Sequence, residues 1–128
     1  LATARAHGVP LTARGAGTSC AGNAVGPGLI LDFSRHMNRV LSIDPEARTA
    51  TVEPGTVMAT LQEAAAPHGL RFGPDPSTWT RATIGGMIGN NSCGASAQAY
   101  GKTADNVRRL RALAAPQDGA HAGHQFAR

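Results

Sequence analysis

A glycine-rich stretch at residues 14–23, RGAGTSCAGN, contains the residue types that could hold a phosphate group. Glycine lets the backbone approach a ligand closely, and the small threonine and serine side chains leave the peptide N–H groups accessible. If three or four of these N–H groups met phosphate oxygens, at about 1.5–3 kcal/mol per charge-assisted bond, the loop alone could hold a diphosphate. Arg14 could add positive charge or merely pack against the loop.

Two familiar phosphate-binding motifs do not match this stretch. The P-loop requires GxxxxGK[ST], whereas the single lysine, Lys102, lies far from the loop. The dinucleotide fingerprint GxGxxG matches at Gly15 and Gly17, but Cys20 stands at its third glycine, and the chain then runs through residues 26–28 into a strand rather than a helix. We therefore expect a strand, a loop whose N–H groups form an anion nest, and a second strand. A flexible turn explains this stretch equally well when it is taken alone.

A second stretch of the same kind, TIGGMIGNNSCG at residues 83–94, favours a long cofactor that the chain touches at several points. It lies within residues 73–101, a segment dominated by loop-forming residues, and so long a loop is uncommon unless it is functional. Thr83 is expected to cap one or two helical turns, although each glycine there weakens a helix by about 1 kcal/mol relative to alanine. Asn90 and Asn91 offer amide groups to a ligand, or cap neighbouring turns instead.

The remaining chain predicts a β-β-β-α unit around these loops. The helix over residues 55–69 should begin at Thr56 as N-cap and end near Pro67 and Gly69. The continuous apolar run at 28–33 should be a strand buried on both faces. The other predicted elements are a helix that ends at Gly8, a strand at 9–13, a hairpin of 39–44 with 48–54, and a strand at 106–114.

Composition indicates a globular protein and argues against several function classes. Of 128 residues, 41% are hydrophobic and 16% charged, and no apolar run could span a bilayer, which favours a cytoplasmic protein. The net charge of +4 is not accompanied by aromatic residues, at 4%, so we expect no nucleic-acid partner. Cys20 and Cys93 lack paired spacing and are expected to be small buried thiols without a disulfide, and the histidines lack metal-ligand spacing. Because the chain begins at Leu1, we expect it to be a fragment.

Three motifs together resemble a known family. RGAGTSCAGN, PDPS followed by ATIGGMIGNNSCG, and YGKTADNV are similar, in order and spacing, to the FAD-binding domain of the FAD-linked oxidases and dehydrogenases, the vanillyl-alcohol oxidase or PCMH-type family. Within it the chain most resembles the D-lactate, glycolate and D-2-hydroxyglutarate dehydrogenases that carry a C-terminal iron–sulfur region. The resemblance implies an α+β fold in which residues 1–128 form an incomplete PCMH-type domain, with the β-β-β-α subdomain and the start of the second subdomain.

The resemblance also implies which residues hold FAD. The loop at 14–23 would wrap the diphosphate, the PDPS corner and residues 83–86 would flank the ribityl chain and diphosphate, and residues 89–94 would run toward the flavin ring. The chain at 101–107 would pass the cofactor on its way into the second subdomain. The implied cofactor-binding residues are Arg14, Gly15, Ala16, Gly17, Thr18, Ser19, Gly22, Asn23, Pro76, Ser77, Thr83, Ile84, Gly85, Gly86, Gly89, Asn90, Asn91, Ser92, Gly94, Gly101 and Val107.

By this resemblance the whole enzyme oxidises a D-2-hydroxy acid to a 2-oxo acid and passes electrons to a quinone or an iron–sulfur partner. The catalytic base, the substrate site and any iron–sulfur cluster would lie outside this chain, and the enzyme could be peripheral to the inner membrane. No histidine lies between residues 14 and 23, so we expect non-covalent FAD. Two alternatives stay open: an FAD oxidase or reductase of the same fold that acts on another alcohol, and a non-catalytic truncated remnant.

Overall fold

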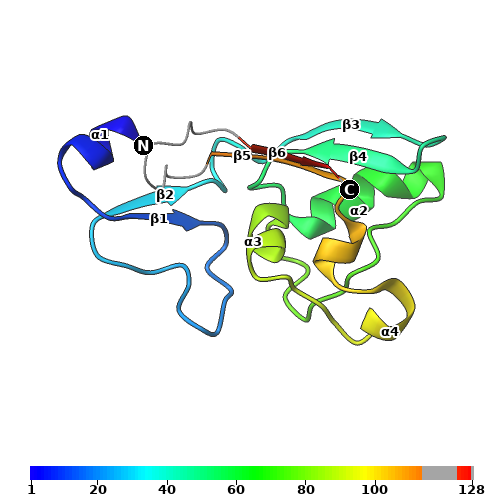
Figure 1. Cartoon of the computed structure of the whole chain (residues 1–128). Helices are drawn as coiled ribbons and strands as arrows, with labels where there is room; N and C mark the ends of the chain where they lie inside the picture. Colours follow the sequence, from blue (N-terminus) through cyan, green and yellow to red (C-terminus); the bar gives the residue numbers. More distant parts are fainter. Residues whose placement is uncertain (114–123, 128) are drawn as a thin grey trace.

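The computed structural model describes residues 1–113 and 124–127 of the chain. It is a mixed structure of short helices and three two-stranded sheets, which confirms the α+β prediction. In chain order the elements are α1 (Ala2–Ala6), β1 (Leu11–Arg14), β2 (Leu29–Asp32), β3 (Val40–Asp44), β4 (Thr49–Val52), α2 (Met58–Ala65), the 3₁₀ helix η1 (Ala66–His68), α3 (Ile84–Gly89), α4 (Ala97–Tyr100), the 3₁₀ helix η2 (Thr103–Asn106), β5 (Arg109–Ala112) and β6 (His124–Ala127) (Figure 1).

The first sheet consists of β1 and β2, which run parallel with Leu11 opposite Leu29 and Arg14 opposite Asp32. Parallel strands are usually joined through a helix. Here the connection is the glycine-rich loop, and no helix lies between the two strands. The predicted strand–loop–strand arrangement is therefore confirmed.

Strand β2 is not buried on both faces, so this part of the prediction was wrong. Leu29 and Ile30 are 47% and 40% exposed. In the described part of the chain the sheet has only two strands, so β2 is an edge strand with a single hydrogen-bonded neighbour. A continuous apolar run predicts a strand, but the elements that pack against it decide its burial.

The second sheet is the predicted hairpin of β3 and β4, with Asp44 opposite Thr49. Helix α2 packs against β3. This helix confirms the prediction except at its start, because its N-cap is Val57 and no side chain caps it. The hydroxyl of the buried Thr56 instead donates to the carbonyl oxygen of Arg39 at 3.0 Å, which ties the helix to the chain before β3.

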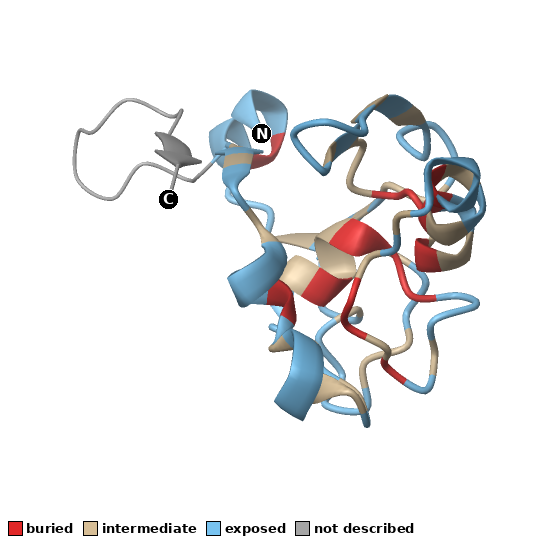
Figure 2. Ribbon diagram, turned by 90° about the vertical axis from the view of Figure 1, so that its right-hand side faces the viewer, coloured by how far each residue is buried: buried red, intermediate tan, exposed pale blue. Residues whose placement is uncertain are grey.

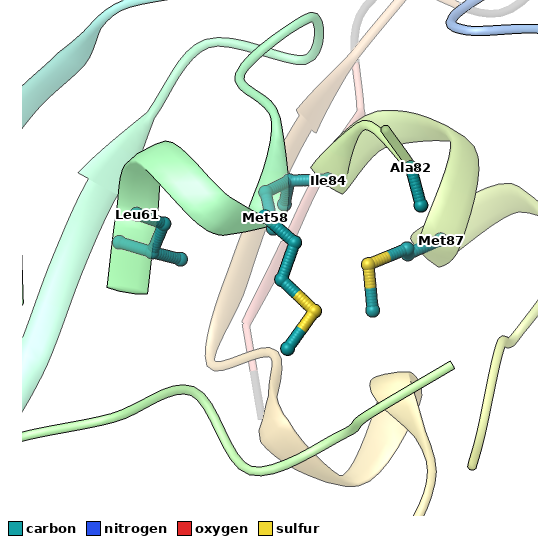
Figure 3. Packing of buried hydrophobic residues seen from close by; sticks show 5 residues of the cluster. All are labelled: Met58, Leu61, Ala82, Ile84 and Met87. Carbon is teal, nitrogen blue, oxygen red and sulfur yellow. The ribbon is translucent and has the colours of Figure 1, made fainter. Parts of the chain in front are cut away.

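The hydrophobic core lies between α2 and α3. It is a cluster of Met58, Leu61, Ala82, Ile84 and Met87, whose side chains converge from the two helices and the chain before α3 (Figure 3). The buried residues, red in Figure 2, lie mostly in α2, in α3 and in the segments that precede them. The loop at 15–24 contributes no residue to this cluster.

The segment from residue 73 to residue 101 holds more helix than predicted. Helix α3 forms as expected, and the hydroxyl oxygen of its N-cap Thr83 accepts from the Gly86 amide at 3.3 Å. The four-residue helix α4 was not predicted, since Ala97–Tyr100 is too short to show a helical repeat. Strand β5 agrees with its prediction and pairs antiparallel with β6.

Candidate cofactor-binding site

A cavity of about 570 Å³ lies between the loop that follows β1 and helix α3, a volume in the range of small-molecule sites. One wall comes from residues 13–24, the other from residues 82–92, and Phe33, Pro54 and Thr78 complete the lining. The two glycine-rich stretches recognised in the sequence therefore face the same space. Arg14 is the charged residue of this lining.

Gly17 shapes the first wall. Its φ of 70° is in the left-handed region, which favours glycine. A Cβ at this position would lie 2.6 Å from Nη2 of Arg14, because the loop folds back over the arginine side chain. The guanidinium is thus held beneath the loop, in the wall of the cavity.

The backbone N–H groups of residues 15–20 lack partners within the described residues. None of them donates to a backbone or side-chain acceptor there, and the first bond beyond them runs from the Ala21 amide to Oγ of Ser19 at 3.3 Å. Backbone N–H groups in proteins are almost always paired with protein, water or ligand. Six consecutive donors along the cavity are therefore available to an anionic ligand.

The backbone N–H groups in the first turn of helix α3, in contrast, already donate to protein acceptors. Ile84 donates to the Thr56 carbonyl and Gly85 to the Pro54 carbonyl, both at 2.8 Å, while Gly86 donates to Thr83. The helix N-terminus therefore has no free donor for a phosphate. Gly85 is required for another reason, since a Cβ there would approach the Pro54 carbonyl oxygen to 2.8 Å.

The two walls touch at two places. Gly15 lies against Thr83, and a Cβ on Gly15 would collide with the Thr83 hydroxyl. Further along, the Asn23 side-chain amide donates to Oδ1 of Asn90 at 2.6 Å. These contacts join residues far apart in the sequence and hold the loop over α3.

Two carboxylates near the site are held in their charged form. The pKa of Asp32 is lowered chiefly by the Ser34 hydroxyl, which donates to it at 2.6 Å, and to a lesser degree by Arg14. The pKa of Asp75 is lowered chiefly by the hydroxyl of Ser96, which donates at 2.7 Å, and by the Ser96 amide. Neither carboxylate lines the cavity.

Most of the residues predicted to bind FAD line the cavity, and the rest lie elsewhere. Those in the lining are Arg14, Gly15, Ala16, Gly17, Thr18, Ser19, Asn23, Thr83, Gly85, Gly86, Gly89, Asn90 and Ser92. Those outside it are Gly22, Pro76, Ser77, Ile84, Asn91, Gly94, Gly101 and Val107. The roles of both groups toward FAD stay predictions.

The outlying residues have structural contacts of their own. Ile84 belongs to the hydrophobic core, and Pro76 is buried. Asn91, with a φ of 45°, accepts from the Ala104 amide at 3.0 Å. Gly94 packs against Asp75, and Gly101 against Asp105.

Sequence reasoning missed several lining residues, namely Ala13, Cys20, Ala21, Ala24, Phe33, Pro54, Thr78, Ala82 and Met87. Most of them lie next to a predicted residue, so adjacency to the glycine motifs could have found them. Phe33 and Pro54 follow β2 and β4, and no local signal marks them.

The cysteine prediction was half right. Cys20 and Cys93 are free, as expected, but both are exposed rather than buried. Cys20 lies in the open loop at the cavity, where no core element packs on it. Among the described residues, no helix is long and apolar enough to cross a bilayer.

Comparison with known proteins places this site in a family. A family model described as FAD binding domain matches residues 1–120. D-2-hydroxyglutarate dehydrogenase of Pseudomonas putida is 46% identical over 105 residues, which are 82% of this chain and 10% of that protein. Glycolate oxidase subunit GlcD of Bacillus subtilis is 39% identical over 123 residues, 95% of this chain and 26% of that protein.

A solved structure of alkyldihydroxyacetonephosphate synthase shares the fold, with a TM-score of 0.74 and 26% identity over 85% of this chain and 23% of that one. The chain spans about a tenth of the length of the D-2-hydroxyglutarate dehydrogenases that it matches. With a family match over residues 1–120, the chain belongs to the FAD binding domain family of the FAD-linked oxidases and dehydrogenases.

Proposed function

We propose that this chain holds the diphosphate of non-covalent FAD in an enzyme that oxidises a D-2-hydroxy acid to the 2-oxo acid. The observation that carries the proposal is the run of unpaired N–H groups at residues 15–20 beside the cavity. A diphosphate needs donors for its oxygens, and this loop supplies them without a helix dipole. The amides at the start of α3 cannot serve this purpose because protein carbonyls and the Thr83 hydroxyl already accept from them.

The residues present fit the cofactor that the family binds. Arg14 would neutralise part of the diphosphate charge, and the loop amides would donate to its oxygens. Glycines at 85, 86 and 89 keep the α3 wall free of side-chain bulk, and a Cβ at Gly89 would meet no atom within 4 Å. The lining holds no histidine to attach flavin, and this favours non-covalent binding. When bound, FAD would supply the acceptor for the substrate α-hydrogen as a hydride equivalent, and a base of the polypeptide would take the hydroxyl proton.

The substrate class is supported by the relatives. The proteins that are 40–46% identical to this chain are named D-2-hydroxyglutarate dehydrogenases, and two further relatives are named glycolate oxidase subunits. Because the chain covers a small part of each, the substrate-binding residues and the base would lie elsewhere in the polypeptide. We place the electron acceptor, a quinone or an iron–sulfur partner, and any iron–sulfur cluster there too. A quinone acceptor would bring the enzyme to the membrane surface.

The test uses the full polypeptide that the gene encodes, purified and reconstituted with FAD. D-2-hydroxyglutarate, D-lactate and glycolate are added separately without oxygen, with the L-enantiomers of the first two as matched controls. We expect one of the three acids to bleach the visible flavin band while the L-acids do not. A flavin-loaded protein that none of them reduces would contradict the substrate class and favour another alcohol as substrate. A polypeptide that retains no FAD would contradict the binding proposal and favour the non-catalytic remnant.

A further inference from the structure

A cluster of three polar side chains, Ser19, Asn23 and Asn90, joins the two walls of the cavity. Asn23 donates through Nδ2 to Oδ1 of Asn90 at 2.6 Å, and Oγ of Ser19 lies 3.5 Å from the same oxygen. Asn90 in turn donates through Nδ2 to the Gly86 carbonyl oxygen at 2.9 Å. All three residues line the cavity. We call this cluster the asparagine latch.

The orientation of Asn90 is fixed by its own helix. The Gly86 carbonyl oxygen can only accept, so the NH₂ group of Asn90 must face it, and the amide oxygen must face the loop. That oxygen accepts from the Asn23 side-chain amide. Because the 3.5 Å contact from Ser19 is long, the bond between the two asparagines carries most of the connection.

The latch is the hydrogen-bonded connection between the walls. Within the described residues, no other hydrogen bond joins residues 15–24 to residues 83–92. Among the described residues, the amides of residues 15–20 find no protein acceptor that would fix the loop in place. Its position over α3 thus depends on the latch at one end and on the Gly15–Thr83 contact at the other.

We propose that Asn23 and Asn90 are positioning residues, which act as one unit to hold the loop in the conformation that binds the FAD diphosphate. This inference rests on the proposed function. A loop held in place before the ligand arrives loses less conformational freedom on binding, which raises affinity. The amide oxygen of Asn90 and one of its amide hydrogens already bond to protein, so both ends of this side chain are held in the connection between the walls.

A double-mutant cycle separates a latch from two independent ligand contacts. The full polypeptide is prepared as wild type, Asn23→Ala, Asn90→Ala and the double variant, and the FAD dissociation constant is measured by flavin fluorescence. Loss of one net hydrogen bond weakens binding about fivefold in each single variant. For a latch, the double variant is also about fivefold weaker, because the second substitution removes nothing further. Two independent contacts would instead give about 25-fold, and that result would overturn the proposal.

Asn91 provides the matched control. It is the neighbouring asparagine, but its side chain accepts from the Ala104 amide and does not line the cavity. The factor by which Asn91→Ala changes the FAD dissociation constant, whatever its size, should multiply with the factor for Asn23→Ala. Non-additivity as strong for this pair as for Asn23 and Asn90 would overturn the proposal, because it would reflect general loosening of the site.

A second measurement does not depend on FAD. The latch joins two protein side chains, so the same four variants should show about fivefold coupling in the equilibrium constant for urea unfolding. Additive unfolding effects would overturn the latch. A wild-type polypeptide that binds no FAD, but shows this coupling, would refute the proposed function and the positioning role while leaving the bond itself established.

Discussion

The contact between Gly15 and Thr83 predicts a large effect from a very small substitution. In Gly15→Ala the new methyl group would collide with the Thr83 hydroxyl and lie 3.1 Å and 3.2 Å from its Cβ and Cγ2. Thr83 has little room to move, since it is only 2% exposed and its hydroxyl oxygen caps α3 by accepting from Gly86. The variant must either push the loop away from α3 or turn the threonine and lose the cap.

The expected cost follows from these two routes. Overpacking in a well-packed site costs about 1–3 kcal/mol, and loss of a threonine N-cap costs about 0.5–2 kcal/mol. Because either route relieves the collision, we expect Gly15→Ala to lower the free energy of unfolding by about 1–3 kcal/mol, a sizeable part of the roughly 5–15 kcal/mol of a typical domain. Urea unfolding followed by circular dichroism measures this difference.

Gly89→Ala is the matched control, because the same methyl group there would meet no atom within 4 Å. It should leave the free energy of unfolding unchanged or raise it by up to about 1 kcal/mol, as alanine favours a helix over glycine. In a Thr83→Ala background, Gly15→Ala should cost less, although the remaining Cβ at 3.1 Å keeps the contact tight. The collision is refuted if Gly15→Ala lowers the free energy of unfolding no more than Gly89→Ala does. It is also refuted if Gly15→Ala costs as much in the Thr83→Ala background as in the wild type.

Three further predictions concern charge, pH and the core. Arg14→Gln should weaken FAD binding about tenfold and flatten its salt dependence, whereas Arg35→Gln, outside the cavity, should change neither. Because the pKa of Asp75 lies below its ordinary value of 3.8, the free energy of unfolding should fall as the pH drops below that value. The fall should be less steep in Asp75→Asn. Equal pH slopes of the two proteins in urea unfolding would contradict this. Met87→Ala, at 1% exposure, should lower the free energy of unfolding by about 2–5 kcal/mol in thermal unfolding, and an effect below 1 kcal/mol would be inconsistent with the core described.

Much of the fold could be predicted because its signals are local. The loop at 14–23, the hairpin turn and the Thr83 cap are each specified by neighbouring residues, and the structure agrees with them. The rejection of a dinucleotide-binding helix after Cys20 also depended on local residues, the glycines and proline at 26–28.

Apart from the short helix α4, the errors concern tertiary contacts. The exposure of Leu29 depends on how many strands flank β2, and a continuous apolar run carries no such information. Thr56 has the side chain of an N-cap, but the Arg39 carbonyl, 17 residues earlier, takes its hydroxyl. Phe33 and Pro54 line the cavity only because β2 and β4 end there. A pattern within a short window of sequence does not show which residues from distant parts of the chain come into contact.

Residues 15–24 contribute no side chain to the hydrophobic core. Ligand binding by this loop and packing of the core therefore depend on different residues of the loop and the helices. Substitutions in this loop that keep Gly15 and Arg14 could change the affinity for the ligand without disturbing the hydrophobic core between α2 and α3. Hydrogen–deuterium exchange should therefore slow at the amides of this loop, residues 15–20, when ligand is added.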